Sequence, residues 1–311
     1  MNKSLVIVTP VYEDVEAAVK LFQQLRLNFG DQIYIVAVDD GSIKCPISSM
    51  DIEGVGIQGV VLKLKHNGGH QKAIAIGLSY VADKLHDFHH VVVMDSDGED
   101  TPESIKSLIE VLDSTGSDIV VAKRKKRVET LKFRAFYIAY KWIFKLLSGR
   151  EISFGNFMVL KLVSLKRLIT MQEIWLHTAG CVLMSKLRIG FCELDRGVRY
   201  SGQSKMNFVG LVLHGFKGLM VFAEDVLVRV GIACALVASM SVIGIVIAVS
   251  LKMFGFATPG WFSIVSGILV LVFMQTGALT LMSLMMTGVM KSGGMQPIDY
   301  NQFIKEVQQA K

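Results

Sequence analysis

Cysteine is scarce in this sequence, and its placement argues against several kinds of site. Only four cysteines occur among 311 residues, with no Cys-x-x-Cys pair. No histidines stand near them at the spacing of metal ligands, so we predict neither a disulfide framework nor a zinc site. The thiols are expected to be reduced, as in a cytosolic protein. A Gly-x-Gly-x-x-Gly turn is also missing after the first apolar run, which argues against a dinucleotide-binding dehydrogenase.

Charge is nearly absent from residues 230–290, which contain a single lysine. Charged residues are frequent up to Arg229, none occurs in 230–251, and a second uncharged run extends from Met253 to Met290. A helix needs about 20 apolar residues to span a bilayer. We therefore expect two transmembrane helices, at about 230–251 and 262–287. A buried helical hairpin in a soluble core is the alternative.

No secretory signal is recognisable at the start, because Leu5–Val8 is short and runs directly into Thr9-Pro10. We expect the polar part to stay in the cytosol and a two-helix hairpin to return the C-terminus there. Lysines and arginines flank the expected spans on that side, whereas the 252–260 loop has one lysine, as the positive-inside rule requires. The expected location is the inner or plasma membrane. The net charge of +6 is attributed to contact with membrane lipids and a phosphorylated substrate, not nucleic acid.

The first half of the sequence alternates short apolar runs with amphipathic segments. This alternation predicts an α/β fold with a mostly parallel sheet covered by helices. The predicted strands are Leu5–Val8, Ile33–Val38, Gly59–Lys65, Val91–Met94 and Ile119–Ala122, and the predicted helices are Val15–Phe29, Gln71–Leu85 and Pro102–Ser114. Basic and aromatic residues interleave from Leu131 to Leu147, which favours a helix at the membrane interface, although a core helix with lysines reaching solvent would look similar.

These patterns divide the chain into four segments. We expect a cytosolic globular domain over 1–207, an amphipathic juxtamembrane segment over 208–229, two transmembrane helices within 230–290, and a cytosolic C-terminal tail over 291–311. Glycines within the two spans would permit close helix packing and make a homo-oligomer plausible.

Polar residues follow four of the predicted strands. Asp95, Ser96 and Asp97 end the fourth strand. Carboxyl ends of parallel strands form the ligand site of open α/β sheets, and paired carboxylates suit a hard cation shared with phosphates. We therefore predict that Asp95 and Asp97 hold Mg²⁺ or Mn²⁺ against a diphosphate. The other strands are followed by Pro10, Tyr12 and Glu13, by Asp39 and Asp40, and by Asn67, Gly68, Gly69 and Lys72.

Residue type suggests what these positions do. Tyr12 could stack on a base, and Asp39 could accept hydrogen bonds from a base or a ribose. The Gly68-Gly69 turn lets backbone approach a ligand just before a helix begins. Lys72 could neutralise phosphate. Each feature alone is an ordinary loop, but the four together predict a nucleotide site.

The order of these motifs resembles the family 2 glycosyltransferases of GT-A fold, and among them the membrane-anchored polyprenyl-phosphate sugar transferases similar to dolichol-phosphate mannose synthase. The resemblance covers essentially the whole chain. Its motifs are Pro10-Val11-Tyr12-Glu13, Val38-Asp39-Asp40-Gly41-Ser42, Asn67 to Ala73, Asp95 to Glu103, Lys123-Arg124, Gly155-Asn156-Phe157 and Arg199 to Met206. It implies a nucleotide-sugar donor, UDP- or GDP-linked, a divalent metal, inversion at the anomeric carbon, and often a polyprenyl-phosphate acceptor.

The resemblance also implies roles for residues outside the strand ends. Arg199 and Lys205 would offset the charge on the departing nucleotide. Asp97 and Asn156 would complete the catalytic set. Ser204 would lie on a loop over the donor. Lys123, Arg124 and Arg127 could hold the acceptor phosphate, although a solvated or lipid-contacting charge run is equally compatible with them.

Asn156 is the most informative departure from the family pattern, because many relatives have an acidic residue there. An amide cannot take a proton, so a hydroxyl acceptor would need its base from Asp100, Glu99, Glu151 or Asp195. A lipid phosphate, whose second pKa is about 6, is already an oxyanion near neutral pH. Asn156 therefore favours a phosphate acceptor.

Two other departures lie in the first motif, where an Asn is missing between Tyr12 and Glu13, and at Gly98-Glu99, which replaces a more usual Leu-Gln. Two other functions stay open: transfer to a glycan or lipid hydroxyl, and a non-catalytic scaffold that binds a nucleotide-sugar. A processive polysaccharide synthase is disfavoured, since a Gln-x-x-Arg-Trp segment is absent.

Overall fold

A computed structural model describes residues 5–124, 131–200, 208–256, 258–292 and 298–311. The chain divides into two compact units: the first comprises 1–131, 152–221 and 296–311, and the second comprises 132–151 and 222–295. The first unit holds the strands β1 Leu5–Val11, β2 Ile33–Asp39, β3 Gln58–Leu64, β4 His90–Val93, β5 Ile119–Arg124, β6 Met158–Lys161, β7 Ile189–Leu194 and β8 Ile304–Ala310. Its α-helices are α1 Val15–Phe29, α2 Ser49–Glu53, α3 His70–Lys84, α4 Ser104–Thr115, α6 Leu162–Leu168, α7 Thr178–Met184 and α8 Phe208–Met220.

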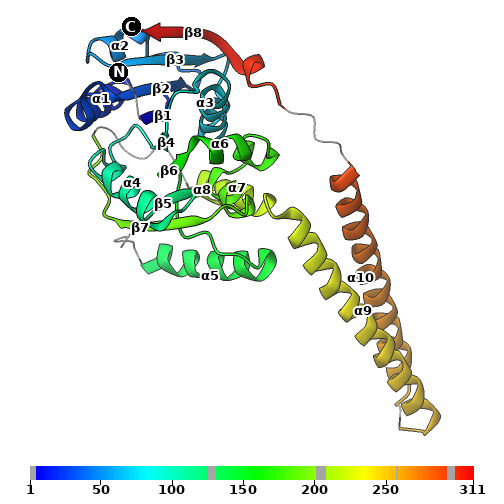
Figure 1. The fold of residues 1–311 in the computed structure, drawn as a ribbon. Coiled ribbons are helices and arrows are strands. Elements are labelled where there is room, and N and C mark those ends of the chain that lie inside the picture. The colour runs from blue at the N-terminus through cyan, green and yellow to red at the C-terminus, as the bar shows by residue number, and fades with distance from the viewer. Residues whose placement is uncertain (1–4, 125–130, 201–207, 257, 293–297) are drawn as a thin grey trace. The chain divides into compact units, whose positions relative to one another are not determined.

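The strands form one sheet in the order β7-β5-β6-β4-β1-β2-β3-β8 (Figure 1). β1 runs parallel to β2 and β4, with Val8 opposite Val36 and Val93. β6 runs antiparallel between β4 and β5, and β8 runs antiparallel to β3. The start of β6 therefore lies at the same sheet edge as the ends of β4 and β5.

Alternate residues of each strand enter two separate cores, one on each face of the sheet. Val6 and Val8 of β1 pack under α3, α6 and α7. Leu5 and Ile7 of the same strand pack under α1, α2 and α4. Because central strands are buried on both faces, they are apolar at nearly every position, as parallel sheets require. The predicted α/β fold of GT-A type is confirmed.

The C-terminal segment contains a strand that the sequence analysis did not anticipate. The residues from Ile304 to Ala310 pair with β3, with Val307 opposite Leu62. Tyr300 also donates a hydrogen bond from its hydroxyl to Asp83 of α3, at 2.7 Å. Part of the expected tail over 291–311 thus belongs to the sheet of the first unit.

The second unit consists of α5 Leu131–Ser148, α9 Ala223–Met253 and α10 Trp261–Ser292. α9 and α10 run side by side, and both are long and apolar enough to cross a membrane (Figure 1). The helices approach closely at Gly244, where an added Cβ would lie 3.1 Å from Leu269. They contain both expected spans and extend beyond them, particularly at the ends joined to the first unit.

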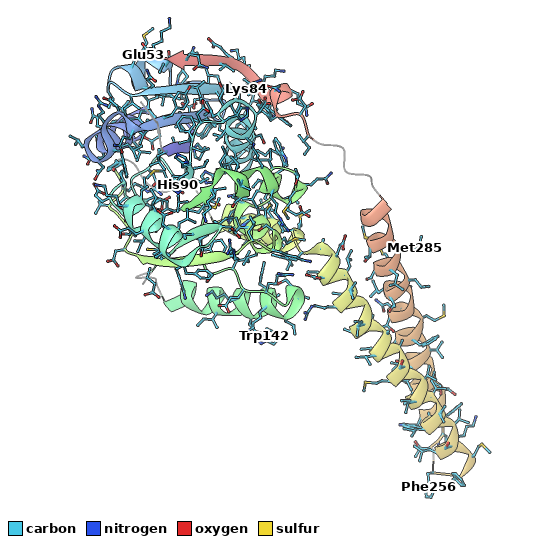
Figure 2. The ribbon with its side chains drawn as sticks, viewed as in Figure 1. Glu53, Lys84, His90, Trp142, Phe256 and Met285 are labelled. Atoms are coloured by element: carbon cyan, nitrogen blue, oxygen red, sulfur yellow. The ribbon has the colours of Figure 1, made fainter. Side chains whose placement is uncertain are left out.

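α5 carries an apolar stripe that solvent would contact in a soluble protein. Ile138, Trp142 and Leu146 repeat every four residues and are all more than half exposed. Trp142 projects outward from the helix (Figure 2). At the other end of α5, Arg150 lies over the ring of Phe222, 5.5 Å from its centroid, and forms an ion pair with Asp225 at 3.8 Å.

Candidate active site

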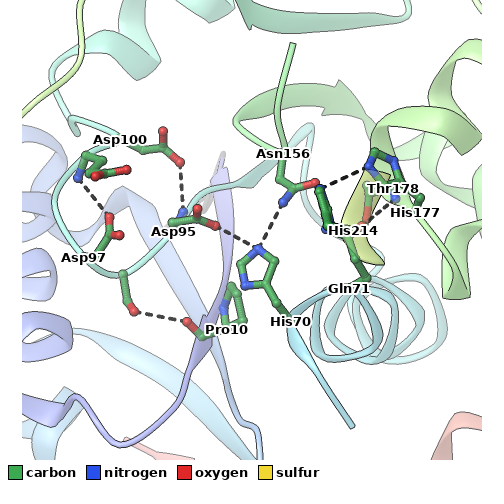
Figure 3. A network of polar contacts seen from close by, with 12 residues as sticks. Pro10, His70, Gln71, Asp95, Asp97, Asp100, Asn156, His177, Thr178 and His214 are labelled. Carbon is green, nitrogen blue, oxygen red and sulfur yellow. Dashed lines mark hydrogen bonds and ion pairs between the residues drawn. The ribbon is translucent and has the colours of Figure 1, made fainter. Parts of the chain in front are cut away.

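Three loops and one strand start meet at one edge of the sheet. β1, β2 and β4 are parallel, so the residues that follow them emerge together, and Asn156 arrives there because β6 begins at that edge. Ser96 donates a hydrogen bond from its hydroxyl to the Pro10 carbonyl at 3.1 Å, which ties the β4 loop to β1 (Figure 3). The structure therefore brings Pro10, Ser96 and the two predicted metal ligands together.

The acidic loop after β4 is held by its own carboxylates. The Asp95 amide donates to Asp100 Oδ2 at 3.0 Å, and the Glu99 amide donates to Asp97 Oδ1 at 3.0 Å. Asp100 is 4% exposed, so its buried carboxylate stabilises the loop through this hydrogen bond. Asp95 and Asp97 retain 30% and 19% side-chain exposure, which leaves both accessible to a ligand.

A second segment, 196–200, packs directly on this acidic loop. The Tyr200 amide donates to the Asp97 carbonyl at 2.8 Å, and the Gly197 amide donates to the Glu99 carbonyl at 3.0 Å. Arg199 reaches Asp97 Oδ2 at 2.7 Å and Glu99 Oε1 at 3.2 Å, and Arg196 pairs with Glu99. The two arginines thus neutralise part of the acidic loop.

The donor set of the acidic loop fits a hard divalent cation. Asp95 and Asp97 offer oxygen ligands from one strand end, and Mg²⁺ or Mn²⁺ typically takes one or two carboxylates together with substrate phosphates. Among the described residues, no group of three or more His, Cys, Asp and Glu side chains could hold a metal. The remaining ligands would come from the substrate and water, and Asp97 would exchange its contact with Arg199 for one with the metal.

Carboxylates also connect the loops after β1, β2 and β3. Glu13, in a left-handed conformation with φ of 49°, accepts hydrogen bonds from the amides of Ile43 at 2.7 Å and Cys45 at 2.8 Å. These bonds hold the pKa of Glu13 below its ordinary value. Asp40 accepts from the amides of Gly68 at 2.7 Å and Gly69 at 3.0 Å.

The ionised form of Asp40 is opposed by burial. Asp40 is 3% exposed, and desolvation raises the pKa of its carboxyl group despite the two backbone hydrogen bonds. Asp39 is also buried, and its Oδ1 accepts a hydrogen bond from the Ser42 amide at 3.0 Å. In the described structure, Glu13 and Asp40 therefore hold the loops after β2 and β3 in place through backbone amides.

The other predicted residues are distributed more loosely. Tyr12 is 43% exposed beside this edge, and Asn67 and Lys72 are exposed on the loop and helix that follow β3. Lys123 is exposed near the end of β5, where Arg124 is the last residue of the strand. Three predicted residues lie outside the described ones: Arg127, Ser204 and Lys205.

Asn156 belongs to a chain of polar contacts on the side of the site away from Asp97 (Figure 3). Its Oδ1 accepts a hydrogen bond from Gln71 Nε2 at 3.2 Å, and its Nδ2 lies 3.0 Å from His70 Nε2. His70 Nε2 also lies 3.2 Å from Asp95 Oδ1. Burial opposes a charge on His70, but the Asp95, Asp40 and Asp100 carboxylates outweigh it and raise the pKa of the imidazole.

A histidine pair, buried His177 and partly buried His214, continues this polar region toward α8. His177 Nδ1 accepts a hydrogen bond from the Gly180 amide at 3.0 Å and caps α7. Because Nδ1 is the acceptor, Nε2 carries the proton and donates it toward His214 Nε2, 3.2 Å away. Burial, with the neighbouring His214, lowers the pKa of His177 to about 4, and burial lowers that of His214 as well.

The four residues considered as alternative bases have different surroundings. Asp100 is buried against the acidic loop, and Glu99 is paired with two arginines. Glu151 belongs to the second unit, where it lies 3.4 Å from Lys141. Asp195 is exposed after β7.

Sequence reasoning assigned no role to several residues that the structure brings to the site. His70 and Gln71 stood inside a recognised motif, and their place at the start of a helix beside the Gly68-Gly69 turn was the available signal. Tyr200 also stood inside a recognised motif, Arg199 to Met206, whereas Arg196 carried no comparable signal, because its contact depends on how the 196–200 segment folds back over the acidic loop.

Comparison with protein families gives a match over the N-terminal half of the chain. The model described as "Glycosyl transferase family 2" matches residues 6–159. This range includes β1 except its first residue, β2 to β5, the first two residues of β6 and the whole acidic loop.

Two bacterial relatives illustrate the range of sequence similarity. An uncharacterized glycosyltransferase, YkcC of Bacillus subtilis (strain 168), is 26% identical over 282 residues, which cover 86% of this chain and 85% of that protein. Undecaprenyl-phosphate 4-deoxy-4-formamido-L-arabinose transferase of Edwardsiella ictaluri (strain 93-146) is 30% identical over 129 residues, which cover 40% of this chain and 38% of that protein.

The fold resembles a solved enzyme structure. Glucosyl-3-phosphoglycerate synthase from Mycobacterium tuberculosis, crystallised with Mn²⁺, UDP-glucose and phosphoglyceric acid, superposes with a TM-score of 0.50 at 14% identity. The match covers 73% of this chain and 79% of that one. At this identity the similarity concerns the fold.

Proposed function

Because residues 6–159 form a glycosyl transferase family 2 domain, we propose that this protein transfers a sugar, with inversion, from a nucleotide-sugar to a polyprenyl phosphate at the cytosolic face of a membrane. The product would be a lipid-phosphate-linked sugar for the assembly of a cell-envelope glycan or glycolipid. One observation carries the choice of acceptor: an amide, Asn156, lies beside the Asp95–His70 pair in a chain that continues into two long apolar helices.

Binding of the donor follows from the loops at the sheet edge. Tyr12 and Asp39 would contact the nucleoside, and Glu13 and Asp40, which hold the neighbouring loops through backbone amides, would support that contact. A divalent cation bound by Asp95 and Asp97 would supply Lewis acidity at the diphosphate. With Asp97 holding the cation, Arg199 would be available to neutralise the departing nucleotide. Lys205, Ser204, Asn67 and Lys72 complete the proposed donor set.

The chemistry at the acceptor side favours an oxyanion nucleophile. A hydroxyl must lose a proton to a positioned base, whereas a phosphate monoester is already ionised near neutral pH, with a second pKa of about 6. Asn156 can donate a hydrogen bond to such an oxyanion but cannot remove a proton. Lys123, Arg124 and Arg127 are proposed to attract the same phosphate.

A membrane location is supported by the two apolar helices and by the path of the chain. β3 precedes both helices and β8 follows them, yet the two strands pair in one sheet. If α9 and α10 cross a bilayer, they must therefore begin and end on the same side. The exposed stripe Ile138, Trp142 and Leu146 on α5 suits the interface of that bilayer.

The test compares acceptors with one donor at a time. Purified protein in detergent receives Mn²⁺, a labelled UDP- or GDP-sugar, and either a polyprenyl phosphate or the matching polyprenol. We expect label to enter the organic phase with the phosphate alone. Transfer to the polyprenol, or to an added glycan, with none to the phosphate would reject this acceptor and favour a hydroxyl. Donor binding without any transfer would favour a scaffold.

A further inference from the structure

The orientation of the Asn156 side chain is set by a backbone group on another helix. The Thr178 amide, at the start of α7, donates a hydrogen bond to Gln71 Oε1 at 2.6 Å. A backbone N–H can only donate, so the oxygen of the Gln71 amide must face Thr178 and its Nε2 must face Asn156. Gln71 then donates to Asn156 Oδ1 at 3.2 Å. This leaves the Asn156 nitrogen on the side of His70 and Asp95, as Figure 3 shows.

The Asn156 nitrogen offers a hydrogen bond to a ligand whichever way His70 is protonated. A primary amide carries two N–H bonds. If His70 Nε2 is unprotonated, it can accept one of them at 3.0 Å and the second remains. If Nε2 carries a proton, that proton suits Asp95 at 3.2 Å, and His70 accepts neither bond. In both states the site presents a donor at Asn156.

We infer that Gln71 is a positioning residue that turns the Asn156 amide so that it presents N–H groups, and not its carbonyl oxygen, to the oxyanion of the acceptor. Gln71 is 6% exposed, so its side chain is separated from solvent, and its described side-chain partners are Thr178 and Asn156. Its effect on the reaction therefore passes through Asn156. This inference rests on the proposed phosphate acceptor, and it assigns selection of an anionic acceptor to the Thr178–Gln71–Asn156 chain.

A change at Gln71 that keeps the Thr178 contact tests the orientation most directly. In Gln71→Glu, a carboxylate oxygen still accepts from the Thr178 amide, but the side chain no longer donates to Asn156 Oδ1 at pH 8. The Asn156 amide is then expected to turn over and face the acceptor with oxygen. Gln71→Met removes both contacts without burying a charge, and it serves as the second variant if Gln71→Glu fails to fold.

The measurement is steady-state transfer to a water-soluble, short-chain polyprenyl phosphate, with separate KM values for acceptor and donor. Loss of a hydrogen bond to a charged group predicts a rise of about tenfold to hundredfold in the acceptor KM. The donor KM should stay within about twofold of the wild-type value. Ser79→Ala is the matched control, since Ser79 is also buried on α3 and donates only to the Ala75 carbonyl in its own helix, at 2.8 Å.

A double-mutant cycle shows whether Gln71 acts through Asn156. Once Asn156→Ala has removed the amide, adding Gln71→Glu should raise the acceptor KM little further. Full additivity, or an unchanged acceptor KM in active Gln71 variants, would overturn the inference while leaving the proposed function intact. Wild-type protein that binds donor but transfers sugar to no lipid phosphate would overturn both.

Discussion

Replacing Gly98 by alanine should disturb the contact between the acidic loop and the 196–200 segment. Gly98 has φ of +89°, and an added Cβ would lie 2.7 Å from ring atoms of Tyr200. The left-handed backbone costs an L-residue about 1–2 kcal/mol. Overpacking against a fixed neighbour adds about 1–3 kcal/mol. The structure thus predicts a loss of about 2–5 kcal/mol in the free energy of unfolding of the first unit.

Gly116→Ala provides the matched control for this prediction. Gly116 ends α4 with φ of +62°, and nothing lies within 4 Å of its added Cβ. Only the backbone cost applies there, about 1–2 kcal/mol. Both substitutions reduce the entropy of the unfolded chain equally, so this effect cancels in the comparison.

The assay is thermal unfolding of the detergent-solubilised protein, followed by tryptophan fluorescence. For a domain of about 200 residues, each kcal/mol shifts the Tm by roughly 2–4 °C. Gly98→Ala should therefore lower the Tm by about 4–20 °C, and Gly116→Ala, which lacks the overpacking, by the smaller amount of about 2–8 °C. Tyr200→Ala removes the ring that the added Cβ would contact. In the double variant Gly98→Ala/Tyr200→Ala, the loss in the free energy of unfolding should therefore be smaller than the sum of the two single losses. Equal Tm shifts in the two glycine variants would refute the close contact.

Two further predictions concern the histidine pair and the nucleotide loops. Because the folded-state pKa of His177 is about 4 and its unfolded value is about 6.5, stability should fall as pH drops from 6.5 toward 4, by up to about 3 kcal/mol. His177→Asn keeps a cap for α7 but cannot titrate. The same slope of Tm with pH in wild type and in His177→Asn would contradict the prediction that His177 causes this loss of stability. Glu13→Gln offers fewer acceptors to the loop amides and should raise the nucleotide-sugar KM about tenfold; Glu16→Gln on α1 is its control, and equal donor KM values would argue against the loop role.

The strands and their polar ends were predictable from local sequence. An apolar run that ends in aspartates fixes both a buried strand and the edge where its carboxylates emerge, and so Asp39 and Asp95 lie at the predicted edge. The predicted helix Val15–Phe29 has the same bounds in the structure, where Asp14 caps it. Each of these features depends on residues that are close in sequence.

Contacts between distant segments could not be read in this way. Asn156 reaches His70, the partner of Asp95, because β6 inserts antiparallel between β4 and β5, a choice that local pattern does not encode. β8 is mostly polar because it is an exposed edge strand, so its sequence resembles a tail. The pairing of Arg199 with Asp97 depends on a chain reversal about 100 residues beyond the acidic loop.

We propose that a cation-binding carboxylate at the end of β4 supports sugar transfer to a lipid phosphate. The most direct measurement is organic-phase label from a UDP- or GDP-sugar panel with polyprenyl phosphate and Mn²⁺, for wild type, Asp97→Ala and Asp113→Ala. Asp113 is an exposed aspartate on α4 and serves as the control. We predict transfer by wild type and Asp113→Ala that EDTA removes, and none by Asp97→Ala. Transfer that persists in Asp97→Ala and in EDTA would contradict the claim.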